Sequence, residues 1–294
     1  MASNQLSTMR AKRSLELDKE QYFTPRAVAD RAVAMMVEAV GEDALSRTWL
    51  EPSAGSGVFL ESLMAAGVKP SNIKAFDLER NHYLVKRQDF FEAEAGLGDG
   101  LITIGNPPFG VGNSLAVPFF NAAAKHSDWV GFVIPRSWRN FTLKNRLDLD
   151  FHQADEFYVG SDFVTPTGQR VGVVDCVFQL WERREEKRVK VEPEDRGYVK
   201  KTNVPEGDVF AHAFAFYLKT AEEAQPGDRA YKTAHPLVQE AFGDLEGALY
   251  NYSNTTTASI GGMSHQTLLW FLNEWFDSHP EEKAIVHAAM EEAE

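Results

Sequence analysis

The sequence is poor in the residues that build disulfide scaffolds and metal sites. Its 294 residues include a single cysteine, Cys176, which excludes a disulfide-stapled fold and thiolate metal clusters. Its eight histidines are scattered without the short spacings of metal ligands, so we expect no metal. No apolar run approaches the roughly 18 residues of a membrane span, and the start lacks the apolar core of a signal peptide. We therefore expect a soluble, cytoplasmic protein with no membrane partner.

The charge of the chain is unevenly distributed. A formal net charge of −13 argues at first against a nucleic-acid partner, because phosphate binding needs clustered lysine and arginine. From residue 202 to the end, however, fifteen acidic residues stand against four basic ones, whereas the first 201 residues are nearly neutral. Residues 183–201 even hold eight basic against five acidic residues. The first two thirds of the chain therefore permit a polyanion partner.

Short apolar runs alternate with helical patterns along the first 184 residues. Residues 27–40 place apolar groups at helical spacing, with Pro25 near the start and Gly41 just past the end. Residues 48–67 predict a short strand, a tight glycine turn and a helix. Further strands are expected at 73–79, 101–105, 129–135, 154–160 and 170–182, a helix at 114–127, and a loop at 161–169. The alternation predicts an α/β sheet with helices on both sides.

The patterns divide the chain into four parts. A polar leader (1–20) precedes the sheet domain (21–184), which a charged linker or ribbon (185–201) separates from an acidic C-terminal region (202–294). In that region we expect an amphipathic helix at 264–276 and a Thr- and Asn-rich loop at 251–262. Because its acids repel phosphate, we expect the region to contact a protein partner or a second copy of the chain.

The tight turn is formed by residues 51–57, Glu-Pro-Ser-Ala-Gly-Ser-Gly. Gly55 and Gly57 let the backbone approach a ligand closely, and the helix start presents free N–H groups. A dinucleotide site expects a third glycine where the sequence has Leu60, and the carboxylate of Glu51 would repel a pyrophosphate. The same carboxylate suits a cationic ligand such as the methionine moiety of S-adenosylmethionine. A tight turn without a ligand stays open as the alternative.

Two further carboxylates follow predicted strands. Asp77 lies 22 positions after Gly55, where it can accept both hydroxyls of a ribose or cap a helix. Asp89 can accept the exocyclic amine of an adenine while the ring of Phe90 packs on the adenine face. Each signal is weak when taken alone.

The most specific motif is Asn106-Pro107-Pro108-Phe109, which follows Gly105 at the end of a predicted strand. The two prolines fix two φ angles and remove two N–H donors, so this strand end presents acceptors. The amide oxygen of Asn106 and the carbonyl of Pro107 can accept both hydrogens of a planar amine, and Phe109 can stack on its ring. Held in this way, the nitrogen lone pair is directed at a methyl donor. A proline-stiffened turn is the alternative.

Taken in order, these motifs resemble those of the gamma-class amino-methyltransferases, the adenine-N6 nucleic-acid enzymes with an Asn-Pro-Pro-aromatic motif. The resemblance covers roughly residues 21–184 and rests on the segments 22–25 (YFTP), 51–57, 77, 89–90, 106–109 and 133–138 (VIPRSW). It implies a class I methyltransferase-like Rossmann sheet of seven strands with the last strand antiparallel. It also implies that S-adenosylmethionine binds across the carboxyl ends of the strands.

The resemblance implies a role for each motif residue. The segment Tyr22-Phe23-Thr24 would close over the methionine end of S-adenosylmethionine, and Glu51, Pro52 and the Gly55–Gly57 turn would hold its amino acid. Asp77 would hold the ribose, and Asp89 with Phe90 the adenine. Asn106, Pro107 and Pro108 would hold the target amine, and Phe109 would stack on the target base. Phe163, in the loop expected before the last strand, would supply a second aromatic ring.

The activity implied is methylation of adenine N6 in DNA by direct transfer, with the base flipped out of the helix. No cysteine lies near the motif, which disfavours cytosine-C5 chemistry, since that reaction needs a covalent nucleophile. The DNA-modifying members carry a long target-recognition domain, whereas this chain has only an acidic segment of modest length. RNA as the substrate, methylation of a glutamine amide in a protein, and a non-catalytic methyltransferase-like subunit therefore stay open as alternatives.

Overall fold

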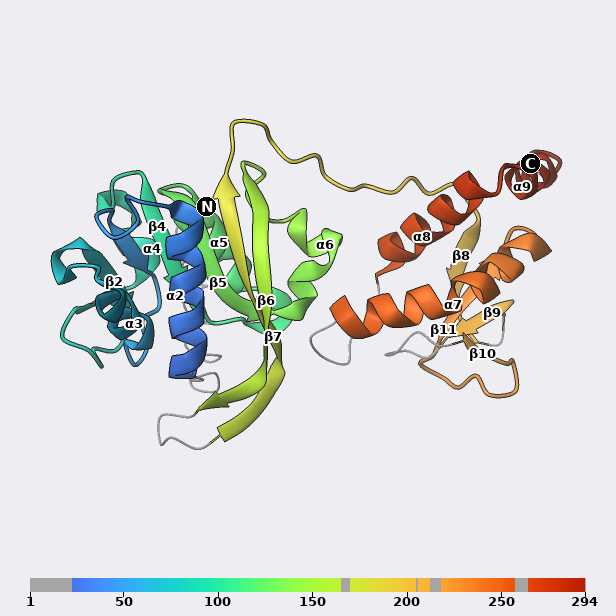
Figure 1. Ribbon diagram of the computed structural model, residues 1–294. Coiled ribbons are helices and arrows are strands. Elements are labelled where there is room, and N and C mark those ends of the chain that lie inside the picture. The colour runs from blue at the N-terminus through green and yellow to red at the C-terminus, as the bar shows by residue number, and fades with distance from the viewer. Residues whose placement is uncertain (1–22, 165–169, 205, 212–217, 257–263, 294) are drawn as a thin grey trace. The chain divides into compact units, whose positions relative to one another are not determined.

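The computed structural model describes residues 23–164, 170–204, 206–211, 218–256 and 264–293 (Figure 1). The chain forms two compact units. The first comprises Met1–Pro135 and Arg146–Val189, and the second comprises Arg136–Asn145 and Lys190–Glu294. The sequence pattern predicts a boundary near residue 184, close to the end of the first unit. No sequence signal sets apart the segment Arg136–Asn145, which joins the second unit through packing.

The first unit is built on a seven-stranded sheet with the order β3-β2-β1-β4-β5-β7-β6. Neighbouring strands among β1 to β5 run parallel, whereas β7 pairs antiparallel with both β5 and β6. The strands are β1 (Trp49–Glu51), β2 (Ile73–Asp77), β3 (Val85–Arg87), β4 (Leu101–Gly105), β5 (Ser127–Pro135), β6 (Phe151–Val164) and β7 (Arg170–Arg183). This order with a reversed last strand is that of the class I methyltransferase sheet, so the predicted fold class is confirmed.

Helices cover both faces of this sheet. The helices are α2 (Arg26–Val40), α3 (Val58–Ala66), α4 (Phe90–Ala93) and α5 (Ala116–Ala124), with 3-10 turns η1 (Pro70–Asn72), η2 (Glu94–Gly96) and η3 (Val111–Asn113). Apolar residues of α2 and α3 pack with Val133 of β5 and Phe178 of β7 in one core. Strand neighbours point to opposite faces, and Phe132 and Trp181 instead meet Phe120 of α5. The predicted three-layer arrangement is therefore present.

One predicted loop differs from the structure. Residues 161–169 were expected to be irregular, but β6 continues to Val164, and the residues 165–169 lie outside the described part. The strand continues because Phe163 pairs with Val171 and Val164 pairs with Arg170 of β7. Turn-forming residues in the local sequence give no sign of this long-range pairing. Phe23 adds an antiparallel bridge to Val164 on the other side. Phe163 therefore lies in a strand and not in a loop.

The second unit combines a small sheet with helices. Its sheet has the order β10-β9-β11-β8, and its core gathers apolar side chains from three strands and from α7, α8 and α9. The elements are η4 (Arg136–Arg139), α6 (Phe141–Lys144), β8 (Val199–Thr202), β9 (Val209–Ala211), β10 (Leu218–Lys219), β11 (Arg229–Thr233), α7 (Pro236–Thr256), α8 (His265–Ser278) and α9 (Pro280–Glu291). The predicted helix at 264–276 is confirmed as α8. The loop expected at 251–262 is wrong for residues 251–256, which extend α7.

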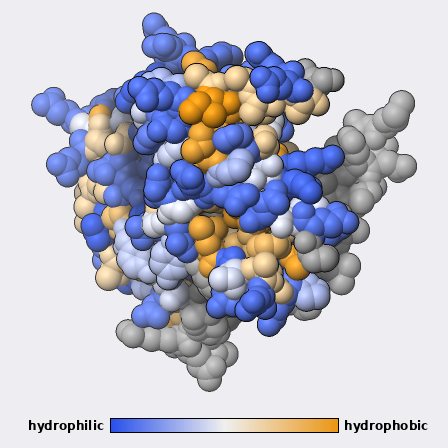
Figure 2. Space-filling view, turned by 90° about the vertical axis from the view of Figure 1, so that its right-hand side faces the viewer, coloured by the Kyte–Doolittle hydropathy of each residue, from blue (hydrophilic) through white to orange (hydrophobic). Residues whose placement is uncertain are grey.

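Some large apolar side chains of the described residues are exposed at the surface. Figure 2 shows one face of the molecule as mostly hydrophilic, interrupted by a few apolar patches. The exposed large apolar side chains of the described residues are Leu45, Leu78, Tyr83, Val111, Tyr158, Val189, Val191, Tyr250 and Ile285. Isolated exposed apolar residues are ordinary on a folded protein. Within the described ranges, no helix has both the length and the apolar character that crossing a membrane requires.

Candidate functional site

The glycine turn and the Asn-Pro-Pro-Phe motif meet at one edge of the sheet. Strands β1 and β4 are parallel neighbours, so their carboxyl ends, Glu51 and Gly105, lie side by side. A Cβ atom added to Gly105 would lie 2.8 Å from Oε1 of Glu51. The hydroxyl of Ser53 donates to the main-chain carbonyl of Asn106 over 3.4 Å. Two motifs separated by some fifty residues of sequence thus form a single site.

The turn itself is held by main-chain hydrogen bonds. Gly55 and Gly57 have φ angles of 50° and 83°, in the left-handed region that favours glycine. The Ala54 amide donates to the Phe76 carbonyl over 2.9 Å, which ties the turn to β2. Gly57 is the N-cap of α3, so the first amides of this helix face the turn. Main-chain N–H groups at a helix start are suited to binding a carboxylate or another polar group.

Asp77 fixes the turn from the end of β2. Its Oδ2 accepts a hydrogen bond from the Gly55 amide over 2.8 Å, and its Oδ1 accepts one from the Glu79 amide over 3.0 Å. Sequence reasoning gave Asp77 a ribose-binding role but did not foresee this contact. Each carboxylate oxygen can accept a further hydrogen bond, so holding the turn and binding a ribose are compatible.

Glu51 is the most perturbed group of this edge. It is 1% exposed, and burial, together with the nearby charge of Asp77, raises the pKa of its carboxyl well above its ordinary value. Its Oε2 accepts no hydrogen bond within the described part of the chain. A buried acceptor without a partner is destabilising by about 1–3 kcal/mol. A cationic amino group placed here would remove that cost.

The segment that precedes α2 covers the turn. The main chain of Phe23 exchanges two hydrogen bonds with Val164 of β6, over 2.7 and 3.1 Å. The ring of Phe23 lies 3.2 Å from the position of a Cβ atom on Gly55. Beside it, Thr24 is 4% exposed, and its Oγ1 has no hydrogen-bond partner among the described residues. Tyr22, the third predicted residue of this segment, lies outside the described residues.

Asp89 and Phe90 lie at the start of α4. Oδ1 of Asp89 accepts a hydrogen bond from the Phe91 amide over 3.0 Å and so caps the helix. Phe90 is 1% exposed and stacks on Phe119, with ring centroids 5.7 Å apart. Both side chains therefore have structural partners, and their contacts with an adenine stay predictions.

The motif that follows β4 is partly accessible. Asn106, Pro108 and Phe109 are half-buried, and Pro107 is buried. The carbonyl of Phe109 accepts the amides of Leu115 and Ala116, over 3.1 and 3.2 Å. That the carbonyl of Pro107 is free to accept a hydrogen of the target amine stays a prediction.

Phe163 lies deeper than a residue in a loop would. It is 1% exposed and belongs to the core cluster that includes Phe157 and Phe178 of β6 and β7. Phe109 packs partly against the same cluster. The structure thus brings both predicted stacking residues to one core, with Phe109 the more exposed. Their contact with a base stays a prediction.

Two residues of this edge were missed by sequence reasoning. The ring of His82 would meet a Cβ atom on Gly57, and its Nε2 lies 2.8 Å from Oε1 of Glu61 in α3. Because Nδ1 accepts from the Leu84 amide, the neutral ring carries its proton on Nε2. The main-chain N–H of Gln88 donates to the main-chain carbonyl of Asp77, and the buried side-chain Oε1 of Gln88 has no partner in the described ranges. Neither residue belongs to a recognisable motif.

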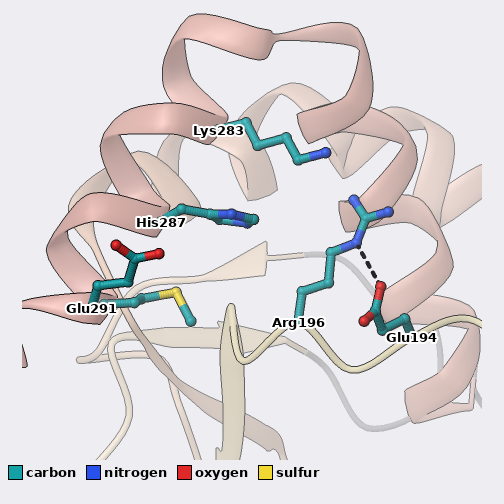
Figure 3. A pocket seen from close by; sticks show the side chains of 6 residues that line it. Glu194, Arg196, Lys283, His287 and Glu291 are labelled. Atoms are coloured by element: carbon teal, nitrogen blue, oxygen red, sulfur yellow. Dashed lines mark hydrogen bonds and ion pairs between the residues drawn. The ribbon is translucent and has the colours of Figure 1, made fainter. Parts of the chain in front are cut away.

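A separate cleft of about 410 Å³ lies in the second unit (Figure 3). Its lining residues are Glu194, Arg196, Lys283, His287, Met290 and Glu291. The cations there already have partners, because Arg196 and Lys283 both pair with Asp277, over 2.8 and 2.6 Å. These contacts lower the pKa of Asp277 to about 2. The cleft thus offers neutralised charges, and the sheet edge of the first unit remains the candidate site.

Comparisons with known proteins find only distant structural similarity. Neither family models nor curated proteins give a match. Among solved structures, the chain is similar to a protein of Pyrococcus horikoshii described as a candidate RNA methyltransferase, at 17% identity and a TM-score of 0.44, over 56% of this chain and 88% of that one. The chain is also similar to the 23S rRNA methyltransferase ErmE, at 11% identity and a TM-score of 0.38, over 87% of this chain and 99% of that one. A third match is the type IIG restriction endonuclease BpuSI, at 13% identity and a TM-score of 0.40, over 60% of this chain and 26% of that one.

With identities of at most 17% and TM-scores of at most 0.44, these similarities assign neither the fold nor the activity of this chain. The strand order and the reversed β7 define a class I methyltransferase-like fold without help from the comparisons. What this chain does with that fold follows from its own site residues.

Proposed function

We propose that this chain is an S-adenosylmethionine-dependent methyltransferase that transfers a methyl group directly to the exocyclic N6 amine of adenine in DNA. The observation that carries the proposal is the meeting of two corners at one sheet edge. One corner is the buried carboxyl of Glu51, whose Oε2 has no hydrogen-bond partner among the described residues, and the other is Asn106-Pro107, which directly follows β4. The first suits a cationic cofactor, and the second suits a planar amine.

The residues of the first corner fit S-adenosylmethionine. The side-chain oxygens Oε2 of Glu51 and Oγ1 of Thr24 are buried acceptors without a partner among the described residues, and an amino group can satisfy them; the Gly55–Gly57 turn would hold the rest of the amino acid. Pro52, Phe23 and Tyr22 belong to the same end in this proposal. Asp77 holds the ribose, and Asp89 with Phe90 the adenine. When bound, the cofactor supplies a methyl group made electrophilic by the attached sulfonium.

The residues of the second corner orient the acceptor. The side-chain oxygen of Asn106 and the carbonyl of Pro107 accept the two hydrogens of the target amine, while Pro108 keeps the turn rigid. The nitrogen lone pair is then withdrawn from the ring and directed at the methyl donor. Phe109 stacks on the base, with Phe163 behind it. The nitrogen releases its extra proton to water after transfer.

Adenine is favoured because its amine lies on a flat aromatic ring that a phenyl group can hold by stacking. A glutamine amide offers the same two hydrogens without that ring. DNA is proposed ahead of RNA, and the nearly neutral first 201 residues permit either polyanion. The acidic C-terminal region (202–294) repels phosphate, so in this proposal it contacts a protein or a second copy of the chain.

The test is a panel of acceptors. The chain is incubated with tritiated S-adenosylmethionine and duplex DNA, structured RNA or a mixture of proteins, and labelled nucleic acid is digested to nucleosides. We expect label in N6-methyladenine from DNA. Label in RNA alone would move the substrate to RNA, and label in protein alone would discard the nucleic-acid assignment. If no acceptor is labelled while the cofactor still binds, the chain is a non-catalytic subunit.

A further inference from the structure

A valine stands exposed next to the proposed catalytic motif. Val111 is 80% exposed, the second most exposed large apolar side chain of the described residues. It lies two positions after Phe109, so at most about 7 Å of chain separates their backbones. Phe109 remains half-buried against the core, whereas Val111 extends into solvent. An apolar side chain is therefore displayed beside the position where the target base would stack.

The backbone around Val111 is fastened on both sides. Leu115 and Ala116 donate their amides to the Phe109 carbonyl, over 3.1 and 3.2 Å. The Val111 carbonyl accepts the Ser114 amide over 3.2 Å, and the Gly112 carbonyl accepts Nη1 of Arg146 over 3.3 Å. The side chain of Val111 thus projects from a loop whose main chain is held by hydrogen bonds.

The loop also adopts conformations that most residues avoid. Gly110 and Gly112 have φ angles of 66° and 59°. Asn113, with a φ of 62°, is the only described residue other than glycine with a positive φ. At Gly110 an added Cβ would lie 2.5 Å from Oγ of Ser114. Glycine adopts positive φ angles readily and asparagine tolerates them, so the sequence of this loop is suited to holding one defined conformation around the valine.

We propose that Val111 is a wedge that enters the base stack of the nucleic-acid duplex and fills the space left when the target adenine swings out. This inference rests on the proposed function, which requires the target amine to leave the duplex. Apolar side chains inserted between base steps are an established way to unstack a duplex. A rigid support is needed for that work, and the anchored loop gives one. Val111 makes no contact with the reacting atoms, so it acts on access of the base and not on transfer.

The test compares Val111→Ala with Val189→Ala. Val189 is 88% exposed in the same unit and gives a matched control far along the chain from the motif. Two substrates of one sequence are used, one with the target adenine paired and one with it opposite an abasic site, where unstacking is already easy. Methylation is measured on both, and a 2-aminopurine at the target position reports flipping by fluorescence.

We expect Val111→Ala to methylate the paired substrate about tenfold more slowly, the factor that two lost apolar groups imply. Its rate on the abasic-opposed substrate and both rates of Val189→Ala should stay within about twofold of the parent protein. An equal fall on both substrates, or none on either, would overturn the wedge. A parent protein that labels no nucleic acid refutes the proposed function itself, which is a different result.

Discussion

Replacing Glu51 by glutamine should change stability and cofactor binding in opposite directions. In the folded chain the carboxyl of Glu51 is buried and its Oε2 has no hydrogen-bond partner within the described ranges, so its charged form is disfavoured. Glutamine keeps the shape and removes the ionisation. Above the ordinary pKa of glutamate, Glu51→Gln should therefore gain stability relative to the parent protein as the pH rises, while losing affinity for a cationic cofactor.

The sign and size of the pH effect follow from linkage. Glu51 ionises near pH 4.5 when unfolded, and its pKa is well above this when folded. Between these two pH values the folded protein binds one proton more than the unfolded chain, so the free energy of unfolding falls as the pH rises. The slope is about 1.4 kcal/mol per pH unit. Below pH 4.5 the contribution is fully present, and above the folded pKa it is fully lost.

Urea unfolding at pH 5 and pH 6 measures this slope. The free energy of unfolding of Glu51→Gln minus that of the parent protein should grow by about 1.4 kcal/mol between the two. Glu42→Gln, which changes an exposed glutamate of the same unit, should show a flat difference. Titration calorimetry should find S-adenosylmethionine bound roughly ten- to hundredfold more weakly by Glu51→Gln, because a hydrogen bond to a charged group is lost. A flat pH difference together with unchanged affinity would refute the reasoning about Glu51.

Two further substitutions, one in each unit, test a packing contact and a helix cap. Gly105→Ala places a Cβ atom 2.8 Å from Oε1 of Glu51 and should lower the free energy of unfolding by about 1–3 kcal/mol, as measured in urea. Gly96→Ala, where an added Cβ meets nothing, is its control and should change stability by less than about 0.5 kcal/mol; equal effects would contradict the contact. In the second unit, Ser264→Ala removes the cap that accepts the Thr267 amide and should cost about 1 kcal/mol. An unchanged thermal or urea transition would show that the cap is not needed.

The first unit could largely be predicted from the sequence, because its signals are local. Apolar residues at helical spacing between Pro25 and Gly41 predict the helix at 26–40, and the glycines before α3 predict the turn there. Alternation of buried strands and helices then restricts the sheet to few topologies. Within the site, the adjacency of Glu51 and Gly105 follows from two parallel strands ending at the same edge.

The remaining features depend on long-range contacts. The carboxylate of Asp77 reaches the Gly55 amide only after β1 and β2 are paired, and no local pattern encodes that bond. Phe163 becomes part of a strand because β7 and Phe23 pair on either side of its segment. In the second unit the strands are two to five residues long, so their alternation is too brief to distinguish them from loops.

The extension of α7 has a similar cause. Residues 251–256 are rich in asparagine, serine and threonine, which favour turns by local propensity. The buried residues Val238, Phe242 and Leu249 earlier in the helix pack into the core of the second unit and stabilise the helix as a whole. Tertiary packing thus overrides local preference at its end.

The account depends most on the proposal that Asn106 and Pro107 bind the target amine. The decisive measurement is methyl transfer by Asn106→Ala with the cofactor affinity determined in parallel, using Asn72→Ala as a surface control in the same unit, where the amide donates to the Ser46 carbonyl. The account predicts a fall in turnover of about 10²- to 10³-fold with cofactor affinity and stability unchanged. If Asn106→Ala transferred methyl groups at the parent rate, or lost cofactor binding in the same proportion as turnover, the assignment of this corner to the amine would be contradicted.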